Sequence, residues 1–432
     1  MSVSRRGFLA TSAAGSLAFA APAVHGANRL KKYRTALIGS GWWGMNILGE
    51  AIAAGESDVV ALADVDRNLL DPAVEQVEEL TGKAPKSYGD YREMLDEQNP
   101  EIVIVATPDH WHPLNTIDAV KAGAHVFVEK PISHTIREGT AMVQAAREAD
   151  RVVQVGTHRR VSPHNMSARD FIREGKLGTV GMVRSFVHYG GGPGTPEPDS
   201  DPPEGLDWDM WCGPAPLVPF NRRIHPRGFR NFLDFANGTL GDWGIHWMDQ
   251  ILWIMDEKYP KRVFSTGGRH IRRDNTDAPD TQVASFEFDD FTAVWEHRQY
   301  AANRAENHNV GCYFYGTEGT LHLGWQDGWS FYDRNSHEPQ IHVPPTLHKP
   351  DDQNIKELWA DMLECIKTGR KPVCDIEYGH QSTVMSLLGM LTLKLGRSVE
   401  WDGTKDEIVG DPEASALLER EYRAPWQYPT VA

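Results

Sequence analysis

The sequence predicts an α/β domain with a doubly wound parallel sheet, followed by an α+β domain with a large, mostly antiparallel open sheet. From residue 33 to about residue 156, short apolar strand-like segments alternate with amphipathic helical segments, which is the pattern of a parallel sheet covered by helices. From Val263 to Tyr332, most of the chain alternates apolar and polar residues between short Asp, Asn and Gly turns, which favours antiparallel pairing. The length of 432 residues is more than one compact core usually holds, so we expect two domains.

The N-terminal residues have the pattern of an export signal. Arg5 and Arg6 precede an apolar, alanine-rich run from Leu9 to Val24, and small residues follow at Gly26 and Ala27. The paired arginines resemble a twin-arginine signal, so we expect residues 1–27 to be a signal peptide and the protein to be periplasmic or otherwise exported. The apolar run is shorter than the roughly 20 residues of a membrane span, which disfavours the alternative of a retained anchor.

The composition is that of a globular, acidic protein. Apolar residues make up 40% of the chain and charged residues 24%. Residues 1–27 carry two arginines and no acid, so their removal takes the formal charge from −16 to −18. This charge disfavours nucleic acid and anionic lipid as partners. The four cysteines show no CxxC spacing typical of a zinc or dithiol site. If the protein is exported, one disulfide is possible, and Cys365 and Cys374 are the nearest pair in sequence.

The first strand leads into a glycine-rich loop. Arg34 to Ile38 is apolar and β-branched, and it meets Gly39-Ser40-Gly41-Trp42-Trp43-Gly44, which opens an amphipathic helix. Glycines at these three places permit a tight turn, close approach of the backbone to a pyrophosphate, and close helix packing. We therefore predict a dinucleotide site of the Rossmann type whose contacts include Gly39, Gly41, Trp42, Trp43 and Gly44.

The second strand ends on a carboxylate that bears on the choice of cofactor. Val59 to Ala63 is followed by Asp64, at the distance along the chain expected for an acid that binds a ribose diol. Such an acid would repel a 2′-phosphate, so the sequence favours NAD. NADP stays possible because Arg67 lies close enough in sequence to reach a phosphate.

Two further strands of the first domain end in polar loops. Glu101 to Ala106 precedes a loop that contains Thr107, Pro108, His110 and His112; after the helix Leu114 to Ala122, Ala124 to Val128 precedes Glu129-Lys130-Pro131, and Arg151 to Val155 closes the sheet. Ligands bind at the carboxyl ends of strands in such sheets, so we place Thr107, Pro108, His112, Glu129 and Lys130 beside the cofactor. His110 and His112 are spaced like a metal pair, but without a third ligand nearby we interpret them as loop packing and pocket polarity.

The second domain combines helices, strands and one long irregular segment. The segment Gly190 to Arg230 is rich in Pro and Gly, and we interpret it as a cover over the pocket. Glu377 and His380 are expected near the pocket edge, and Trp325 and Trp329 are interpreted as core or interface aromatics rather than sugar platforms. The other elements predicted here are a helix Pro163 to Glu174, strands Gly181 to Tyr189, Thr281 to Phe288, Phe291 to Arg298, Val310 to Tyr315 and Thr320 to Leu323, and helices Asn354 to Thr368 and Gln381 to Leu395.

The segment Gly241 to Asp249 carries the strongest indication of chemistry. On a helix, Asp242 and His246 lie four residues apart and share one face. A carboxylate beside an imidazole would hold its tautomer and raise its pKa, which suits an acid or base near neutral pH. The alternative for such a pair in isolation is a helix N-cap aspartate and a buried, hydrogen-bonded histidine.

Together the glycine loop, Asp64, the Ala-Thr-Pro loop and Glu129-Lys130-Pro131 resemble the Gfo/Idh/MocA family of sugar and cyclitol oxidoreductases, over most of residues 33–402. The resemblance implies that Lys130 contacts the reacting hydroxyl, that Pro131 is cis, that His246 exchanges the hydroxyl proton and that Asp242 holds substrate. It also implies a Rossmann domain at 33–156, a substrate and oligomerisation domain at 157–402, a C-terminal tail at 403–432, and a dimer or tetramer. The residues expected to contact substrate are His158, Arg160, Trp208, Asn221, His225 and Asp242, although many relatives have a plain polar residue where this chain has Thr157-His158.

The expected function is hydride transfer between a nicotinamide cofactor and a ring hydroxyl or keto group of a sugar, glycoside or cyclitol. Free nicotinamide is scarce outside the cytoplasm, and the twin-arginine route carries folded protein, so we expect tightly bound NAD. The alternatives are a redox-neutral NAD-dependent glycosidase and a non-catalytic sugar or cofactor sensor. A metal-dependent hydrolase that uses Asp242, His246 and Asp249 is less favoured, and the sequence leaves the sugar and the oxidised carbon open.

Overall fold

The computed structural model describes residues 31–302, 306–348 and 353–430. The expected signal peptide lies outside these residues. Within them, no helix has the length and apolar character needed to cross a membrane.

The first domain is built on a six-stranded, wholly parallel sheet in the order β3-β2-β1-β4-β5-β6. This is the Rossmann order, in which the chain reverses direction between β1 and β4 and leaves a crevice at the carboxyl ends of these strands. The strands are β1 (Tyr33–Ile38), β2 (Ser57–Ala63), β3 (Lys86–Tyr88), β4 (Ile102–Val105), β5 (His125–Val128) and β6 (Val153–Val155). The prediction of a doubly wound parallel sheet is confirmed.

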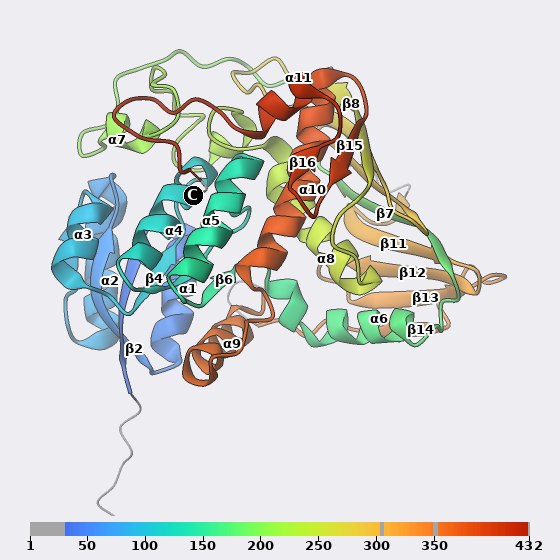
Figure 1. Cartoon of the computed structure of the whole chain (residues 1–432), viewed down its shortest axis with the longest axis horizontal. Helices are drawn as coiled ribbons and strands as arrows, with labels where there is room; N and C mark the ends of the chain where they lie inside the picture. Colours follow the sequence, from blue (N-terminus) through green and yellow to red (C-terminus); the bar gives the residue numbers. More distant parts are fainter. Residues whose placement is uncertain (1–30, 303–305, 349–352, 431–432) are drawn as a thin grey trace, which may run out of the picture. The chain divides into compact units, whose positions relative to one another are not determined.

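Helices cover both faces of this sheet (Figure 1), which explains why all four residues of β4 are apolar and buried. One face packs against α3 (Tyr91–Gln98), α4 (His112–Lys121) and α5 (Ile136–Glu148). The other face packs against α1 (Trp42–Ala53), α2 (Arg67–Thr81) and α9 (Ile355–Thr368). Because α9 comes from late in the chain, the first hydrophobic core is completed by residues far beyond residue 156.

The second domain contains a ten-stranded sheet in the order β14-β13-β12-β11-β7-β10-β9-β8-β15-β16. Every neighbouring pair is antiparallel except β7 and β10, which run parallel. The strands are β7 (Val180–His188), β8 (Arg262–Gly268), β9 (Thr281–Glu287), β10 (Thr292–Arg298), β11 (Val310–Gly316), β12 (Gly319–Gly324), β13 (Trp329–Asp333), β14 (Ile341–Val343), β15 (Val399–Asp402) and β16 (Glu407–Ile408). The predicted open, mostly antiparallel sheet is confirmed.

Three helices bury one face of the large sheet: α6 (Pro163–Arg173), α8 (Ile245–Met255) and α10 (Ile376–Leu395). The long helix α10 lies between the two domains, packed on α5 on one side and on β8 on the other (Figure 1). It begins five residues before the predicted start because the Asp375 side chain caps it by accepting a hydrogen bond from the Glu377 amide.

The irregular segment between β7 and α8 has a small aromatic core of its own. It contains only α7 (Trp208–Cys212), the 3₁₀ turn η3 (Gly228–Asn231) and the π-helical turn η4 (Leu240–Gly244). Trp208 stacks on Trp211 with ring centroids 4.5 Å apart, and Phe235 packs edge-on against Trp211. Its ordered packing explains how a segment this long can form a fixed cover.

The remaining short elements are the 3₁₀ turns η1 (Asp109–Trp111), η2 (His158–Val161) and η6 (Ala416–Leu418), and the helix α11 (Pro412–Ser415). The chain after η6 returns to the first domain, where the Tyr428 hydroxyl lies 2.7 Å from that of Thr135. All four cysteines are buried and free, so the structure contains no disulfide between Cys365 and Cys374.

Candidate active site

A cavity of about 590 Å³ opens where the carboxyl ends of β1, β2, β4 and β5 face the second domain. Its size is typical of sites for small molecules and cofactors. Residues from both domains line it. The predicted site residues that line the cavity are Gly39, Gly41, Trp42, Trp43, Asp64, Thr107, Pro108, His112, Glu129, Lys130, His225, Asp242 and His246.

The glycine loop is shaped by steric limits that only glycine meets. Gly39 has φ +93°, and a Cβ there would lie 2.7 Å from the Ala106 backbone. A Cβ at Gly44 would lie 2.0 Å from the Gly39 carbonyl oxygen, so this glycine lets α1 pack against the loop. Gly41 has open space in front of it, and α1 begins without a side-chain cap, so its first amide groups are available to an anion. These features fit the pyrophosphate of a dinucleotide.

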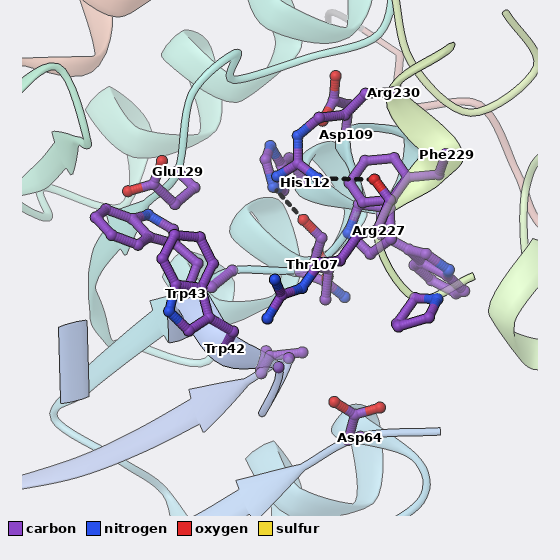
Figure 2. A pocket seen from close by; sticks show the side chains of 18 of the residues that line it. Trp42, Trp43, Asp64, Thr107, Asp109, His112, Glu129, Arg227, Phe229 and Arg230 are labelled. Atoms are coloured by element: carbon purple, nitrogen blue, oxygen red, sulfur yellow. Dashed lines mark hydrogen bonds between the residues drawn. The ribbon is translucent and has the colours of Figure 1, made fainter. Parts of the chain in front are cut away.

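Asp64 lies at the end of β2 and points into the cavity (Figure 2). Its Oδ2 accepts hydrogen bonds from the Ser40 amide at 2.7 Å and the Ser40 hydroxyl at 3.0 Å, which tie it to the glycine loop. Burial raises the pKa of Asp64. The carboxylate thus lines the cavity beside the glycine loop, and its binding of a ribose diol stays a prediction.

The structure corrects the prediction for Arg67, which does not line the cavity. Its side chain is largely exposed and lies 3.6 Å from Asp71, one turn further along α2. The reason is that the preceding residue, Asp66, turns inward instead, caps α2 and pairs with His225 at 2.8 Å. This geometry places no cation of α2 where it could compensate a 2′-phosphate, which favours NAD.

His112 joins the loops that follow β4 and β5. Its Nε2 lies 2.8 Å from the Thr107 carbonyl oxygen (Figure 2), and its Nδ1 lies 2.7 Å from the Pro131 carbonyl oxygen. Burial lowers the pKa of His112 to about 4. The Lys130–Pro131 peptide is cis, as the family resemblance implies. His110 instead contacts the Trp211 carbonyl oxygen at 3.0 Å, so both histidines act in loop packing.

Lys130 is hydrogen-bonded to Asp242, the residue that was predicted to act with it in the site. Its Nζ donates hydrogen bonds to the Asp242 carbonyl oxygen at 2.8 Å and to Asp242 Oδ1 at 3.0 Å. Arg230 Nε donates to the same Oδ1 at 3.1 Å. Burial opposes the charged form of Asp242, but the charges of Lys130 and Arg230 outweigh it and lower the pKa of this carboxyl. The two domains thus meet in a fixed lysine–aspartate–arginine group.

His246 lines the same cavity within an aromatic surround. The Trp325 ring lies 4.9 Å from the imidazole between centroids, and the His158 ring lies 5.6 Å away. Nδ1 is buried without a hydrogen-bond partner, which leaves Nε2 as the ring nitrogen that faces the cavity. Burial, with the charges of Lys130 and Arg159, lowers the pKa of His246 well below its ordinary value.

The prediction that Asp242 raises the pKa of His246 is therefore wrong. The Asp242 carboxylate is taken up by Lys130 and Arg230, and no hydrogen bond joins it to the imidazole in the described part of the chain. The turn that carries Asp242 is π-helical, and α8 begins only at Ile245, so the two residues do not share one regular α-helix. The lowered pKa favours the neutral form of the His246 imidazole.

Asp109 and Arg230 are cavity residues that the sequence did not indicate directly. Asp109 is buried, its Oδ2 has no hydrogen-bond partner, and burial raises its pKa to about 7. Figure 2 shows Asp109 beside Arg230, and Arg230 is the residue at the end of the cover segment. The available signal for Asp109 was a carboxylate in the polar segment that follows β4. For Arg230 the signal was its place at the end of the predicted cover.

Two family models account for most of the chain. Residues 33–157 match the model for the NAD-binding Rossmann fold of the Gfo/Idh/MocA oxidoreductase family, and residues 189–428 match the model for the C-terminal alpha/beta domain of that family. The chain belongs to the Gfo/Idh/MocA oxidoreductase family.

Individual relatives match over shorter stretches. A levoglucosan dehydrogenase of Pseudarthrobacter phenanthrenivorans is 27% identical over 185 residues, which are 41% of this chain and 40% of that protein. A glycosyl hydrolase family 109 protein of Stenotrophomonas maltophilia is 33% identical over 140 residues, 31% of each protein. A 1,5-anhydro-D-fructose reductase of Ensifer adhaerens is 35% identical over 101 residues, 23% of this chain and 30% of that one. The matched stretch is thus less than half the length of each of these relatives.

Solved structures show that the fold is shared. A levoglucosan dehydrogenase in complex with NADH and levoglucosan superposes with a TM-score of 0.66 at 18% identity, and the match covers 86% of this chain and 99% of that one. The WlbA dehydrogenase from Bordetella pertussis in complex with NADH and UDP-GlcNAcA gives a TM-score of 0.64 at 19% identity, with 86% and 99% covered.

Four residues that were predicted to contact substrate lie outside the cavity. Arg160 forms a buried ion pair with Asp249 at 2.9 Å, which also removes Asp249 from any metal set with Asp242 and His246. His158 lies beside His246 but does not line the cavity. Trp208 and Asn221 serve the internal structure of the cover segment, where their side chains donate to the carbonyl oxygens of Val218 and Glu197.

Two further expectations about the pocket also need correction. Glu377 is bound by Arg147 and Lys371, and His380 lies 3.0 Å from Asp406, so neither reaches the cavity. Trp325, which we interpreted as a core or interface aromatic, lines the cavity beside His246. A single tryptophan after a strand gives no signal in the sequence that separates these uses.

Proposed function

We propose that this protein transfers hydride between NAD and a ring hydroxyl or keto group of a sugar, glycoside or cyclitol. The observation that carries the proposal is that Lys130 and His246, from different domains, line one cavity with the glycine loop and Asp64. The family match supports the reaction type. The names of the relatives, which include levoglucosan dehydrogenase and anhydrofructose reductase, support a sugar-like substrate.

The residues present fit a dinucleotide. The start of α1 would bind the pyrophosphate, Asp64 the ribose diol, and the loop of Thr107 and Pro108 with Glu129 would lie beside the nicotinamide half. Arg227 of the cover segment lies over the Trp42 ring at 5.2 Å and helps close the groove around this cofactor. When bound, NAD supplies the acceptor for the hydride.

The side chains of the site then act on the substrate hydroxyl. His246, held neutral by burial, accepts the hydroxyl proton at Nε2. Lys130 uses its remaining N–H to donate to the same oxygen and stabilises the negative charge that develops there. Asp242 keeps the ammonium group oriented, and Arg230 fixes Asp242.

Two substitutions test these roles. Lys130→Met and His246→Ala should each lower turnover by orders of magnitude, because each removes a group that acts on the reacting oxygen. Both variants should retain NAD binding, measured by calorimetry, since neither residue shapes the glycine loop. Turnover is followed by absorbance of the reduced nicotinamide across a panel of sugars, and near-native rates in either variant would contradict the assignment.

We also propose that residues 1–27 direct export by the twin-arginine route, and that NAD is bound before export and stays bound. The paired arginines and the short apolar run support this proposal. Replacement of Arg5 and Arg6 by lysine should leave the protein in the cytoplasmic fraction. Native mass spectrometry of the exported protein should show one nicotinamide per chain, and export without cofactor would contradict the second part.

A redox-neutral glycosidase is the second candidate function, supported by the similarity to glycosyl hydrolase family 109 proteins. Bound NAD would then be reduced and reoxidised within one cycle. Release of a glycosidic product without net NADH would identify this reaction, whereas a dehydrogenase accumulates NADH. Retained sugar binding without any turnover would instead indicate a sensor.

We further propose a homo-oligomer, either a dimer or a tetramer, since an open sheet with one face free of helices commonly pairs with itself. Light scattering coupled to size exclusion measures this directly, and a monomer at micromolar concentration would contradict it.

A further inference from the structure

A second group of ligand-type side chains lies on the large sheet, away from the cavity. His322 is on β12, Asp327 is in the turn between β12 and β13, and His308 lies two residues before β11. The neighbours of His322 on β12, Leu321 and Leu323, are core residues, and side chains alternate along a strand, so His322 points to the opposite face. None of the three ligand-type residues lines the active-site cavity.

The three side chains converge. His308 Nδ1 lies 3.0 Å from Asp327 Oδ2, and the rings of His308 and His322 stack with centroids 3.8 Å apart. One ligand atom from each residue lies within 4.8 Å of the other two. His322 is only 3% exposed, and its Nε2 is buried without a hydrogen-bond partner. An unsatisfied buried nitrogen is unfavourable unless it has a ligand to bind.

The backbone leaves room for these groups through two paired glycines. Gly311 on β11 lies opposite Gly324 on β12. A Cβ at Gly311 would lie 2.6 Å from His322 Nε2, and a Cβ at Gly324 would lie 1.7 Å from Asp327 Oδ1. Any other residue at either position would displace one of the three converging side chains.

We propose that His308, His322 and Asp327 form a binding site for a divalent transition-metal ion, Zn²⁺ in the first place, with water completing the coordination. Imidazole nitrogens and a carboxylate oxygen are zinc ligands at about 2.0–2.2 Å, which separates tetrahedral ligand atoms by about 3.4 Å. The ligand atoms lie within 4.8 Å of one another, and the stacked rings of His308 and His322 would have to turn toward the ion as it binds. The ion would fasten the segment before β11 to the turn between β12 and β13, and it takes no part in hydride transfer.

A neighbouring cluster on the same face of the sheet provides the contrast. His188, Glu296 and Glu306 have a similar ligand composition and spacing. Here, however, Arg184 donates to Glu296 at 2.6 Å and to Glu306 at 2.9 Å, and the His188 ring lies 2.8 Å from Glu296. The arginine already supplies the positive charge that these carboxylates require, so we expect no metal there.

The test is Zn²⁺ titration of full-length protein purified without a histidine tag and treated with chelator. Calorimetry should show one equivalent bound with micromolar or tighter affinity, and Zn²⁺ should raise the melting temperature. His308→Gln and Asp327→Asn should each weaken binding by more than about tenfold. Glu306→Gln, in the contrasting cluster, should bind as the unchanged protein does.

Circular dichroism establishes that each variant is folded, and two ligand variants are used so that misfolding of one leaves the other as a test. Absence of stoichiometric Zn²⁺ binding, or equal affinity in His308→Gln and the unchanged protein, would overturn the proposal. Because the readout is metal binding, its failure is distinguishable from a failure of the proposed sugar oxidoreduction.

Discussion

At the scale of single residues, Asp109 is a buried carboxyl group whose pKa is raised. Burial raises its pKa to about 7, whereas an unfolded aspartate titrates near pH 4. The folded protein therefore binds this proton more tightly than the unfolded chain does. The resulting stabilisation is fully present below about pH 4 and is lost as the pH rises through about 7.

Asp109→Asn tests this linkage. The variant has no carboxyl to ionise at this position, so above about pH 7 it should be more stable than the unchanged protein, by about 1.4 kcal/mol for each pKa unit of the shift. Near pH 4 the two proteins should differ little. Urea unfolding across this range measures the difference, and parallel pH profiles would contradict the raised pKa.

The buried ion pair between Arg160 and Asp249 gives a second prediction at this scale. Both side chains are almost fully buried, so Arg160→Met leaves an uncompensated carboxylate and should cost about 3–5 kcal/mol of unfolding free energy. The matched control is Lys83→Met in the exposed pair with Asp58, which should cost at most about 1 kcal/mol. Equal shifts in the two urea midpoints would refute a structural role for the buried pair.

The residues of the candidate active site show what the sequence could predict and what it could not. Lys130, Asp64 and His246 could be placed because each follows a recognisable strand or motif. The partners of Asp242 could not, because Lys130 is 112 residues away in the chain and Arg230 lies in an irregular segment. Local spacing suggested His246 as the partner, but two cations bind a buried carboxylate more strongly than a neutral imidazole does.

At the scale of elements, α1 contains two glycines that differ in whether a side chain would fit at their position. Gly44→Ala would place a Cβ 2.0 Å from the Gly39 carbonyl oxygen, so α1 must move away from the loop. NAD affinity should then fall by more than about tenfold, since the amide groups at the start of α1 lose their position. Gly49 lies in the same helix, and a Cβ there would meet no neighbouring atom within 4 Å, so this glycine serves as the control.

Gly49→Ala should stabilise the protein by about 0.5–1 kcal/mol and leave NAD affinity unchanged, because alanine has the higher helix propensity. Calorimetry with NAD and thermal unfolding separate the two effects. Loss of NAD binding in both variants would show that helix rigidity, rather than the close contact at Gly44, controls the site.

The elements themselves were largely predictable, for physical reasons that also explain the exceptions. Strands such as β4 and helices such as α9 have strong periodicity over their whole length, and their bounds agree with the prediction within a few residues. The π-helical turn before α8 has the same apolar pattern as an α-helix, so the sequence contained no sign of it. Nor does periodicity indicate that α9 completes the core of the other domain.

At the scale of the whole molecule, the cavity depends on contacts that fix the cover segment to the first domain. His225 pairs with Asp66 at the start of α2, and the Asp207 amide donates to the Val65 carbonyl oxygen at 2.9 Å. On the other side, Arg423 of the C-terminal tail donates to the carbonyl oxygens of Gly213 and Ala215 and pairs with Asp209 at 2.7 Å. The tail thus restrains the part of the cover that carries Met210 and Trp211 into the cavity.

Arg423→Ala should therefore weaken the retention of NAD more than it weakens the fold. The cover loses four hydrogen bonds from one guanidinium group, and its looser end lets the cofactor dissociate faster. Arg397→Ala is the control, since this arginine also pairs with two carboxylates, Asp411 and Glu413, but lies away from the cover. The rate of NADH release, followed by the fluorescence of the reduced nicotinamide after dilution, should rise severalfold only for Arg423→Ala. An equal rise in both variants would mean that general destabilisation, and not the hold of the tail on the cover, sets how long the cofactor stays bound.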